Sequence, residues 1–254
     1  MNCHICGEVT TPWEKAKILK KYEVSYYRCP NCGFVQTEKP YWLDEAYSTV
    51  IDMEDIGILA RNNSNAAVVD RLLTAFFPSA KTFLDAGGGY GIFVRLMRDR
   101  GFDFHWDDKY TQNLFARGFE KSRDRYDVVT AFELFEHYDE PLKEIKNLAE
   151  LGENIVFSTI LLPEPVPRPG EWWYYSTSTG QHISFYTKQA LEHCARLIGC
   201  HYTGTADIHI FSKRKIPYWQ FRFCVSRMGK ILFYKRRESL LSKDHEQLTG
   251  EKLV

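Results

Sequence analysis

Three glycines alternate along one short stretch and follow an aspartate by two residues. The stretch runs from Asp85 through Gly87 and Gly89 to Gly91. Residues 81–84 are short and apolar enough for a buried strand, and apolar residues recur at helical spacing after the last glycine. Glycine adopts positive φ angles and lets a ligand approach the backbone closely, while amides at a helix N-terminus face such a ligand. The stretch therefore predicts a ligand-binding turn between a strand and a helix.

Two glycine patterns were compared with this turn. The dinucleotide fingerprint G-x-G-x-x-G does not fit, because its third glycine falls on Ile92 when read from Gly87 and on Val94 when read from Gly89. The pattern D-x-G-x-G-x-G fits without a misfit. It resembles motif I of the class I S-adenosylmethionine (SAM)-dependent methyltransferases, in which the acid and the glycines hold the amino acid part of SAM. The resemblance implies the same role for the aspartate and the three glycines here.

A second acidic position lies about 20 residues beyond the turn. Residues 102–106 alternate as a second strand, and Asp107 and Asp108 follow it directly. A carboxylate at this place can accept hydrogen bonds from both ribose hydroxyls of a cofactor. Asp108 fits the methyltransferase pattern better than Asp107, and a turn-capping aspartate is the alternative for either. Phe119 lies where the family contacts adenine, with a core aromatic as the equal alternative.

Acidic residues and a histidine follow the next predicted strand, over 125–133. The sequence Glu133-Leu134-Phe135-Glu136-His137 is similar to the fourth-strand motif of small-molecule methyltransferases. Ligands of open α/β sheets bind at the carboxyl ends of the strands, so Glu133 is expected beside the cofactor. His137 either helps to cap this loop or acts as a catalytic base.

A second histidine, His182, lies in the segment GQHISFYT at 180–187, which precedes a helix predicted over 188–198. This segment resembles one group of methyltransferases whose members often act on sugars or other small metabolites. A histidine at this place can take a proton from a hydroxyl, an amine or an activated carbon, and its unperturbed pKa suits that task. His182 is therefore the preferred catalytic base, and a loop-holding histidine is the alternative. Four aromatic residues at 172–175 are expected to line or cover something.

Two C-x-x-C-G knuckles stand near the start of the chain, at Cys3 and Cys6 and at Cys29 and Cys32. Four thiolates on two tight turns form a closed tetrahedral zinc site, which leaves no position for substrate. The pattern predicts a structural zinc ribbon, and a redox dithiol is the alternative.

Strands and helices must position these residues. Their alternation from 81 to 159 predicts an α/β fold with a doubly wound, mostly parallel sheet. The resemblance to zinc-ribbon sugar methyltransferases covers residues 1 to about 212. We therefore expect a zinc ribbon over 1–39, a Rossmann-like SAM methyltransferase domain over 40–212 and a basic, aromatic-containing extension over 213–254.

Composition limits the classes of partner. The formal net charge of the 254 residues is zero, which argues against a protein that grips nucleic acid through its overall field. No apolar run approaches the length of a transmembrane helix and no signal peptide is recognisable, so we expect a cytoplasmic protein. The basic extension either packs on the domain or contacts a membrane surface.

These patterns together predict an enzyme that moves a methyl group from SAM to a small polar acceptor such as a sugar or a nucleotide-sugar. One alternative is an RNA methyltransferase that uses the zinc ribbon for binding. Another is an interaction protein whose SAM fold is a non-catalytic scaffold.

Overall fold

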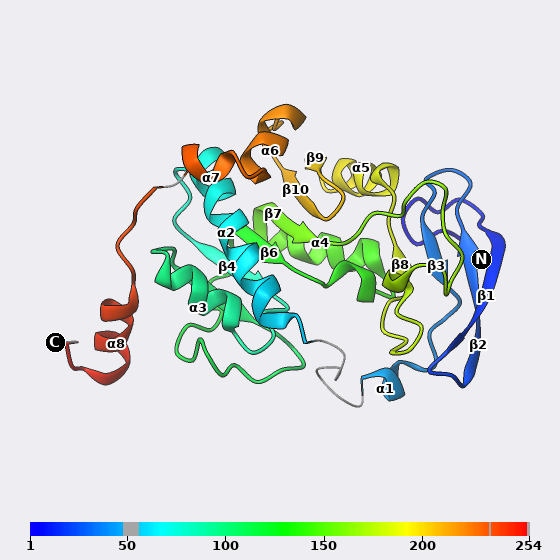
Figure 1. The fold of residues 1–254 in the computed structure, drawn as a ribbon, viewed down its shortest axis with the longest axis horizontal. Coiled ribbons are helices and arrows are strands. Elements are labelled where there is room, and N and C mark those ends of the chain that lie inside the picture. Colours follow the sequence, from blue (N-terminus) through cyan, green and yellow to red (C-terminus); the bar gives the residue numbers. More distant parts are fainter. Residues whose placement is uncertain (48–55, 234, 253–254) are drawn as a thin grey trace.

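The computed structural model describes residues 1–47, 56–233 and 235–252 of the chain. A central six-stranded sheet lies between helices, and a smaller sheet lies at the end that holds the N-terminus (Figure 1). The central strands are β4 (Phe83–Ala86), β5 (Phe104–Asp107), β6 (Tyr126–Ala131), β7 (Gly152–Ser158), β9 (His201–Gly204) and β10 (Ile208–Ser212). The smaller sheet contains β1 (Thr11–Ile18), β2 (Tyr22–Arg28), β3 (Val35–Thr37) and β8 (Ser184–Phe185).

The central sheet has the strand order β5-β4-β6-β7-β10-β9. The first four of these strands run parallel, and β10 is antiparallel to both of its neighbours. The predicted α/β fold with a mostly parallel sheet is therefore confirmed. The chain places β5 on one side of β4 and β6 on the other, so the strand order reverses beside β4, where doubly wound sheets bind ligands.

Helices cover both faces of this sheet. Consecutive residues of its buried strands point to opposite sides, so both faces present apolar side chains that must be covered. Val128 packs in one cluster with residues of three helices, whereas Val129 packs in another cluster with two others. The first three helices are α2 (Ile58–Phe76), α3 (Ile92–Asp99) and α6 (Tyr218–Val225), and the other two are α4 (Pro141–Leu151) and α5 (Lys188–Leu197). The short elements are α1 (Leu43–Ala46), η1 (Phe135–His137), η2 (Trp173–Tyr175), α7 (Gly229–Leu232) and α8 (Leu241–Thr249).

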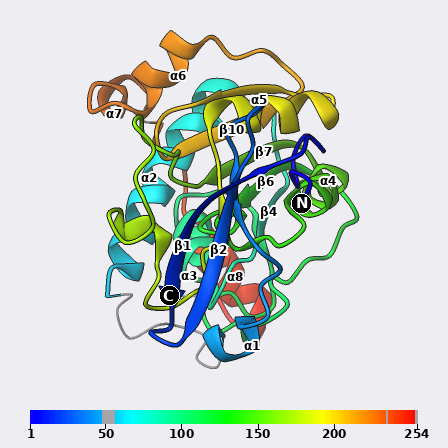
Figure 2. The same ribbon diagram turned by 90° about the vertical axis from the view of Figure 1, so that its right-hand side faces the viewer.

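The smaller sheet joins the N-terminal segment to a loop about 150 residues away, and its strands β1 and β2 lie in front of the central sheet in the view of Figure 2. Strand β3 pairs antiparallel with β8, where Val35 lies opposite Phe185. Just beyond β8, the Thr187 hydroxyl donates a 2.5 Å hydrogen bond to the carbonyl of Cys32. Both knuckles also contribute buried residues to the cluster of α4 and α5. No pattern in the sequence indicated the pairing of β3 with β8.

The C-terminal segment packs on the central domain through α6 and α8, among other contacts. Phe221 and Cys224 of α6 are buried in the cluster that contains α2. In α8, the carboxylate of Asp244 accepts two hydrogen bonds, of 2.8 and 2.7 Å, from the guanidinium of Arg98 in α3. Within the described ranges, no helix combines the length and the hydropathy needed to span a bilayer.

Candidate functional site

The glycine turn follows β4 at the carboxyl edge of the sheet and leads into α3. Gly87, Gly89 and Gly91 all have positive φ angles. A Cβ atom added to Gly87 would lie 2.8 Å from the Leu134 side chain, and one added to Gly91 would lie 2.7 Å from the Asn113 side chain. A Cβ atom added to Gly89 would meet nothing within 4 Å. Two glycines therefore permit close packing, and the third faces open space that a ligand can fill.

Asp108 holds the middle of this turn. One carboxylate oxygen accepts a 3.0 Å hydrogen bond from the amide of Gly89, and the other accepts bonds from the amides of Tyr110 and Thr111. Asp107 contacts the turn through its backbone, since its carbonyl accepts a 2.8 Å bond from the Gly87 amide. Asp108 thus caps its own loop, and the oxygen that accepts from Gly89 keeps one acceptor position that a ribose hydroxyl can use.

Asp85 is buried beneath the turn. Its carboxylate accepts a 2.6 Å hydrogen bond from the Thr130 hydroxyl of β6. Burial raises the pKa of Asp85 from 3.8 to about 7, the Thr130 bond opposes this shift, and the nearby charge of Asp108 adds to it. A cationic group such as an ammonium would favour the ionised form at this place.

The raised pKa of Asp85 predicts a pH-dependent stability difference. The folded state keeps the proton up to about pH 7, while the unfolded chain releases it near pH 4, so the stabilisation is complete at low pH and is lost as pH rises. The free energy of unfolding of Asp85→Asn, measured with urea, should therefore gain about 3 kcal/mol on that of the parent between pH 5 and pH 8. An equal difference at the two pH values would contradict this.

Two further predicted cofactor residues lie near the turn. Phe119 is 2% exposed and lies under the guanidinium of Arg98, 3.7 Å from its ring centroid, which favours the core alternative. Glu133 follows β6 with a positive φ of 49°. Its Oε1 accepts a 2.6 Å hydrogen bond from the hydroxyl of Ser158, the last residue of β7. Glu133 therefore ties together the carboxyl ends of two neighbouring strands.

His137 and His182 are brought together from loops 45 residues apart. Their ring centroids are 4.9 Å apart and their planes are nearly perpendicular. Nδ1 of His182 donates to the carbonyl of Tyr174 at 2.6 Å, because a carbonyl oxygen only accepts. Nδ1 of His137 lies 3.1 Å from the carbonyl of Gln181 and 2.9 Å from the Tyr47 hydroxyl. The backbone carbonyls of Tyr174 and Gln181 favour the tautomer of each ring that carries the proton on Nδ1. The lone pair of each Nε2 is then available.

Burial changes the protonation of this pair. It lowers the pKa of His137 to about 4 and, together with the neighbouring His137, lowers the pKa of His182 to about 3. Both imidazoles are therefore neutral at neutral pH. The sequence analysis assumed an unperturbed pKa for His182, and the structure corrects that assumption because the ring is desolvated.

Glu136 lies beside the two histidines and is fully buried. Burial, together with the nearby Glu133, raises the pKa of its carboxyl to about 8. Leu134, in the same loop, contacts Gly87 of the glycine turn. The amide of Ile183 donates a 2.9 Å bond to the carbonyl of Glu136. The 133–137 loop thus contacts both the glycine turn and the loop of His182.

Three members of this site are brought to it only by the fold. Tyr47 and Gln181 contact His137, and Glu136 was interpreted only as part of a capped loop. The aromatic run also behaves differently from the expectation, since Tyr174 and Tyr175 are buried in the core of the smaller sheet and Trp173 is 75% exposed. No local signal in the sequence distinguishes these cases, because each depends on contacts between distant segments.

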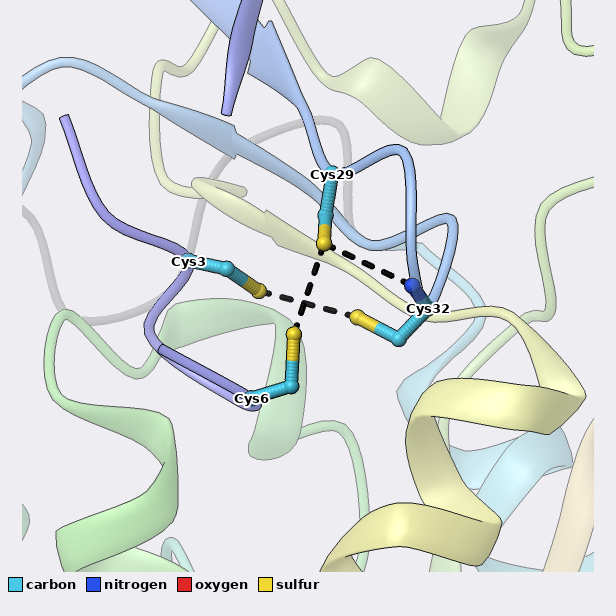
Figure 3. A group of neighbouring side chains, drawn as sticks. All are labelled: Cys3, Cys6, Cys29 and Cys32. Carbon is cyan, nitrogen blue, oxygen red and sulfur yellow. Dashed lines mark hydrogen bonds between the residues drawn. The ribbon is translucent and has the colours of Figure 1, made fainter. Parts of the chain in front are cut away.

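Four cysteines converge between the two knuckles (Figure 3). Sγ of Cys3 lies 3.6 Å from Sγ of Cys32, and Sγ of Cys6 lies 3.4 Å from Sγ of Cys29. Tetrahedral zinc with Zn–S bonds of about 2.3 Å separates its ligands by about 3.8 Å, so the group fits the ion. The hydrogen bond from the Cys32 thiol lowers the pKa of Cys3 to about 5, which favours the thiolate that a metal requires.

The chain was then compared with known proteins. The sequence profile of a methyltransferase domain family matches residues 59–203. No curated protein matches the chain.

Solved structures with a similar fold include several methyltransferases. CalO1, a methyltransferase in calicheamicin biosynthesis solved with SAH, is 16% identical, with a TM-score of 0.43 and coverage of 59% of this chain and 54% of that one. Human N-acetylserotonin methyltransferase with SAM is 11% identical, with a TM-score of 0.44 and coverage of 60% and 52%. Magnesium protoporphyrin IX methyltransferase from Synechocystis PCC 6803 with SAH is 15% identical, with a TM-score of 0.45 and coverage of 66% and 90%.

The matched region therefore spans about half the length of the first two of these structures. The family profile, in contrast, covers more than half of this chain, from α2 to β9, and includes the glycine turn and both histidines. The chain therefore belongs to the methyltransferase domain family.

Proposed function

We propose that the protein transfers a methyl group from SAM to a hydroxyl group of a small polar acceptor. The observation that carries this proposal is the direct contact between the glycine turn and the loop of the histidine pair, through Gly87 and Leu134. Such contact brings a cofactor on the turn close to two neutral imidazoles with free lone pairs. Proximity and orientation then supply much of the rate enhancement.

The geometry of the glycine turn supports the following cofactor contacts. The open space beside Gly89 receives the amino acid part of SAM, with Asp85 below it to favour its ammonium. Asp108 accepts from a ribose hydroxyl at the acceptor position that its bond to the Gly89 amide leaves free. Glu133 holds the floor of the site through Ser158.

His182 accepts the proton of the acceptor in this proposal. The hydroxyl oxygen forms a bond to the methyl carbon, the carbon–sulfur bond breaks, and its electron pair remains on the sulfur of S-adenosylhomocysteine. The hydroxyl proton passes to Nε2 of His182, whose Nδ1–H stays fixed on the Tyr174 carbonyl. His137 stands next to it as the alternative base.

The acceptor is a sugar or a nucleotide-sugar in this proposal. The resemblance of the 180–187 segment to sugar methyltransferases supports this class, and the zero net charge disfavours RNA. Zinc on the four cysteines is proposed as a structural ion. It stiffens the sheet that pairs with β8 and so holds the loop of His182.

Methyl transfer from SAM with a labelled methyl group tests the proposal. The protein is incubated separately with nucleotide-sugars, free sugars and RNA, and we expect label in a nucleotide-sugar or sugar fraction. Gly89→Val, which fills the open space of the turn, should abolish transfer. Gly170→Val is the matched control, because Gly170 also has a positive φ and an open Cβ direction but lies in another loop. Label in RNA alone, or in no fraction, would overturn the proposal.

A further inference from the structure

The burial of Glu136 is energetically unfavourable, and the methyl transfer described above does not account for it. The side chain is fully buried, and neither carboxylate oxygen has a hydrogen-bond partner among the described residues. The hydroxyls of Tyr174 and Thr159 lie nearby but hydrogen-bond each other at 3.2 Å. A buried polar group without a partner costs about 1–3 kcal/mol, and a charged one costs more. A buried carboxyl group of this kind is stabilised when a bound group supplies the missing polar interaction.

The histidines supply two more ligand atoms directed at the same place. One atom from each of Glu136, His137 and His182 lies within 4.8 Å of the other two. The Nδ1 atoms of both rings are engaged by backbone carbonyls, at Tyr174 and Gln181. Such outer hydrogen bonds fix the orientation of metal-binding imidazoles and leave Nε2 for the ion. No direct hydrogen bond joins the carboxylate to either ring.

The acidic groups of this region also favour the binding of a cation. Glu133 lies close to Glu136, so two carboxyl groups share one buried region. The ion pairs found among the described residues include neither of them. Two neutral imidazoles add no positive charge to this region, whereas a divalent cation would stabilise the ionised form of the carboxyl groups.

We infer that Glu136, His137 and His182 bind a divalent transition-metal cation at the acceptor side of the site. Mixed imidazole and carboxylate ligands suit ions such as Mn²⁺, Fe²⁺, Co²⁺ and Zn²⁺, while the thiolates of the knuckles select zinc. The inference rests on the proposed function, because it assigns the same side chains to the activation of the acceptor. Three protein ligands leave open positions at which the hydroxyl oxygen of an acceptor can bind.

A bound cation would change how the acceptor loses its proton. It would polarise the hydroxyl, as a Lewis acid does, so that the proton leaves to water while the oxygen attacks the methyl carbon and the electron pair of the carbon–sulfur bond stays on sulfur. The imidazoles would then serve as ligands. In protein without this cation, Nε2 of His182 would receive the proton directly.

Binding of Mn²⁺, followed by electron paramagnetic resonance, tests the inference. The full chain is first shown by elemental analysis to carry one zinc, and Mn²⁺ is then added. We expect the parent to bind one Mn²⁺ and to unfold at a higher temperature in its presence, because a ligand of the folded state stabilises it. Glu136→Gln should lose more than the roughly 10–100-fold in affinity that loss of an outer-shell partner costs.

Glu140→Gln is the matched control. It carries the same substitution four residues away, on an exposed side chain that pairs with Lys143, and should bind Mn²⁺ like the parent. His182→Gln provides a second test in case Glu136→Gln does not fold. The inference is wrong if the parent fails to bind Mn²⁺. It is also wrong if Glu136→Gln and His182→Gln both bind Mn²⁺ like the parent. SAM titration of the same samples separates the two proposals, since SAM binding without Mn²⁺ binding overturns only the metal site.

Discussion

Replacing Cys29 with serine should remove zinc from the chain and disable the enzyme. A structural zinc site contributes an apparent binding energy of about 10–16 kcal/mol in small zinc-binding peptides, which equals or exceeds the net stability of a typical domain. Cys29 and Cys32 are buried in the same cluster as α4 and α5. Loss of zinc should therefore lower the unfolding temperature of the whole chain. Elemental analysis and thermal unfolding monitored by circular dichroism measure the two effects.

The activity of this variant should fall because of the pairing of β3 with β8. Ser184 of β8 lies two residues after His182, and Gln36 of β3 lies opposite it. A disordered β3 would release this loop. Cys200→Ser is the matched control, because Cys200 is a partly buried thiol that does not belong to the group of four cysteines. A Cys29→Ser protein that keeps one zinc and the parent's unfolding temperature would contradict the structural role of the knuckles.

Replacing His182 with alanine should slow turnover by about 10²–10⁴-fold, the usual contribution of a positioned acid or base. SAM affinity should stay within about twofold of the parent, because the proposed cofactor contacts come from the ends of β4 and β5. Single-turnover rates with saturating SAM, together with calorimetric SAM titration, measure the two quantities.

His201→Ala is the control for this substitution, since His201 is exposed at the start of β9. His137→Ala tests the order of the two histidines. If it abolishes turnover with SAM still bound while His182→Ala has little effect, the roles of the two residues are reversed. Unchanged turnover in both variants would mean that neither side chain handles the acceptor proton.

The parts of the fold that local sequence determines could be predicted. The strand predicted over 125–133 corresponds to β6, and the glycine turn marked the junction of β4 with α3. The knuckle spacing likewise predicted the four-cysteine cluster, because each pair of ligands lies on one turn. In each case the signal and the structure lie within a few neighbouring residues.

Features that depend on distant segments could not be predicted. The pairing of β3 with β8 joins residues 35 and 185, and no pattern in either segment names the other. The three glycines of the turn look alike in sequence, yet only at Gly89 does the space beyond the backbone stay open. The lowered pKa of His182 and the isolated carboxylate of Glu136 both result from burial. Burial of a single polar side chain is a property of the assembled fold.

Calorimetric titration of the purified protein with SAM, and in parallel with NAD, tests the central proposal most directly. We predict one SAM site per chain, no comparable binding of NAD, and a loss of about 1.5–3 kcal/mol of SAM binding energy in Asp108→Ala, the usual worth of hydrogen bonds to a charged group. Tighter binding of NAD than of SAM, with SAM affinity unchanged in Asp108→Ala, would contradict the assignment of the glycine turn as a SAM site.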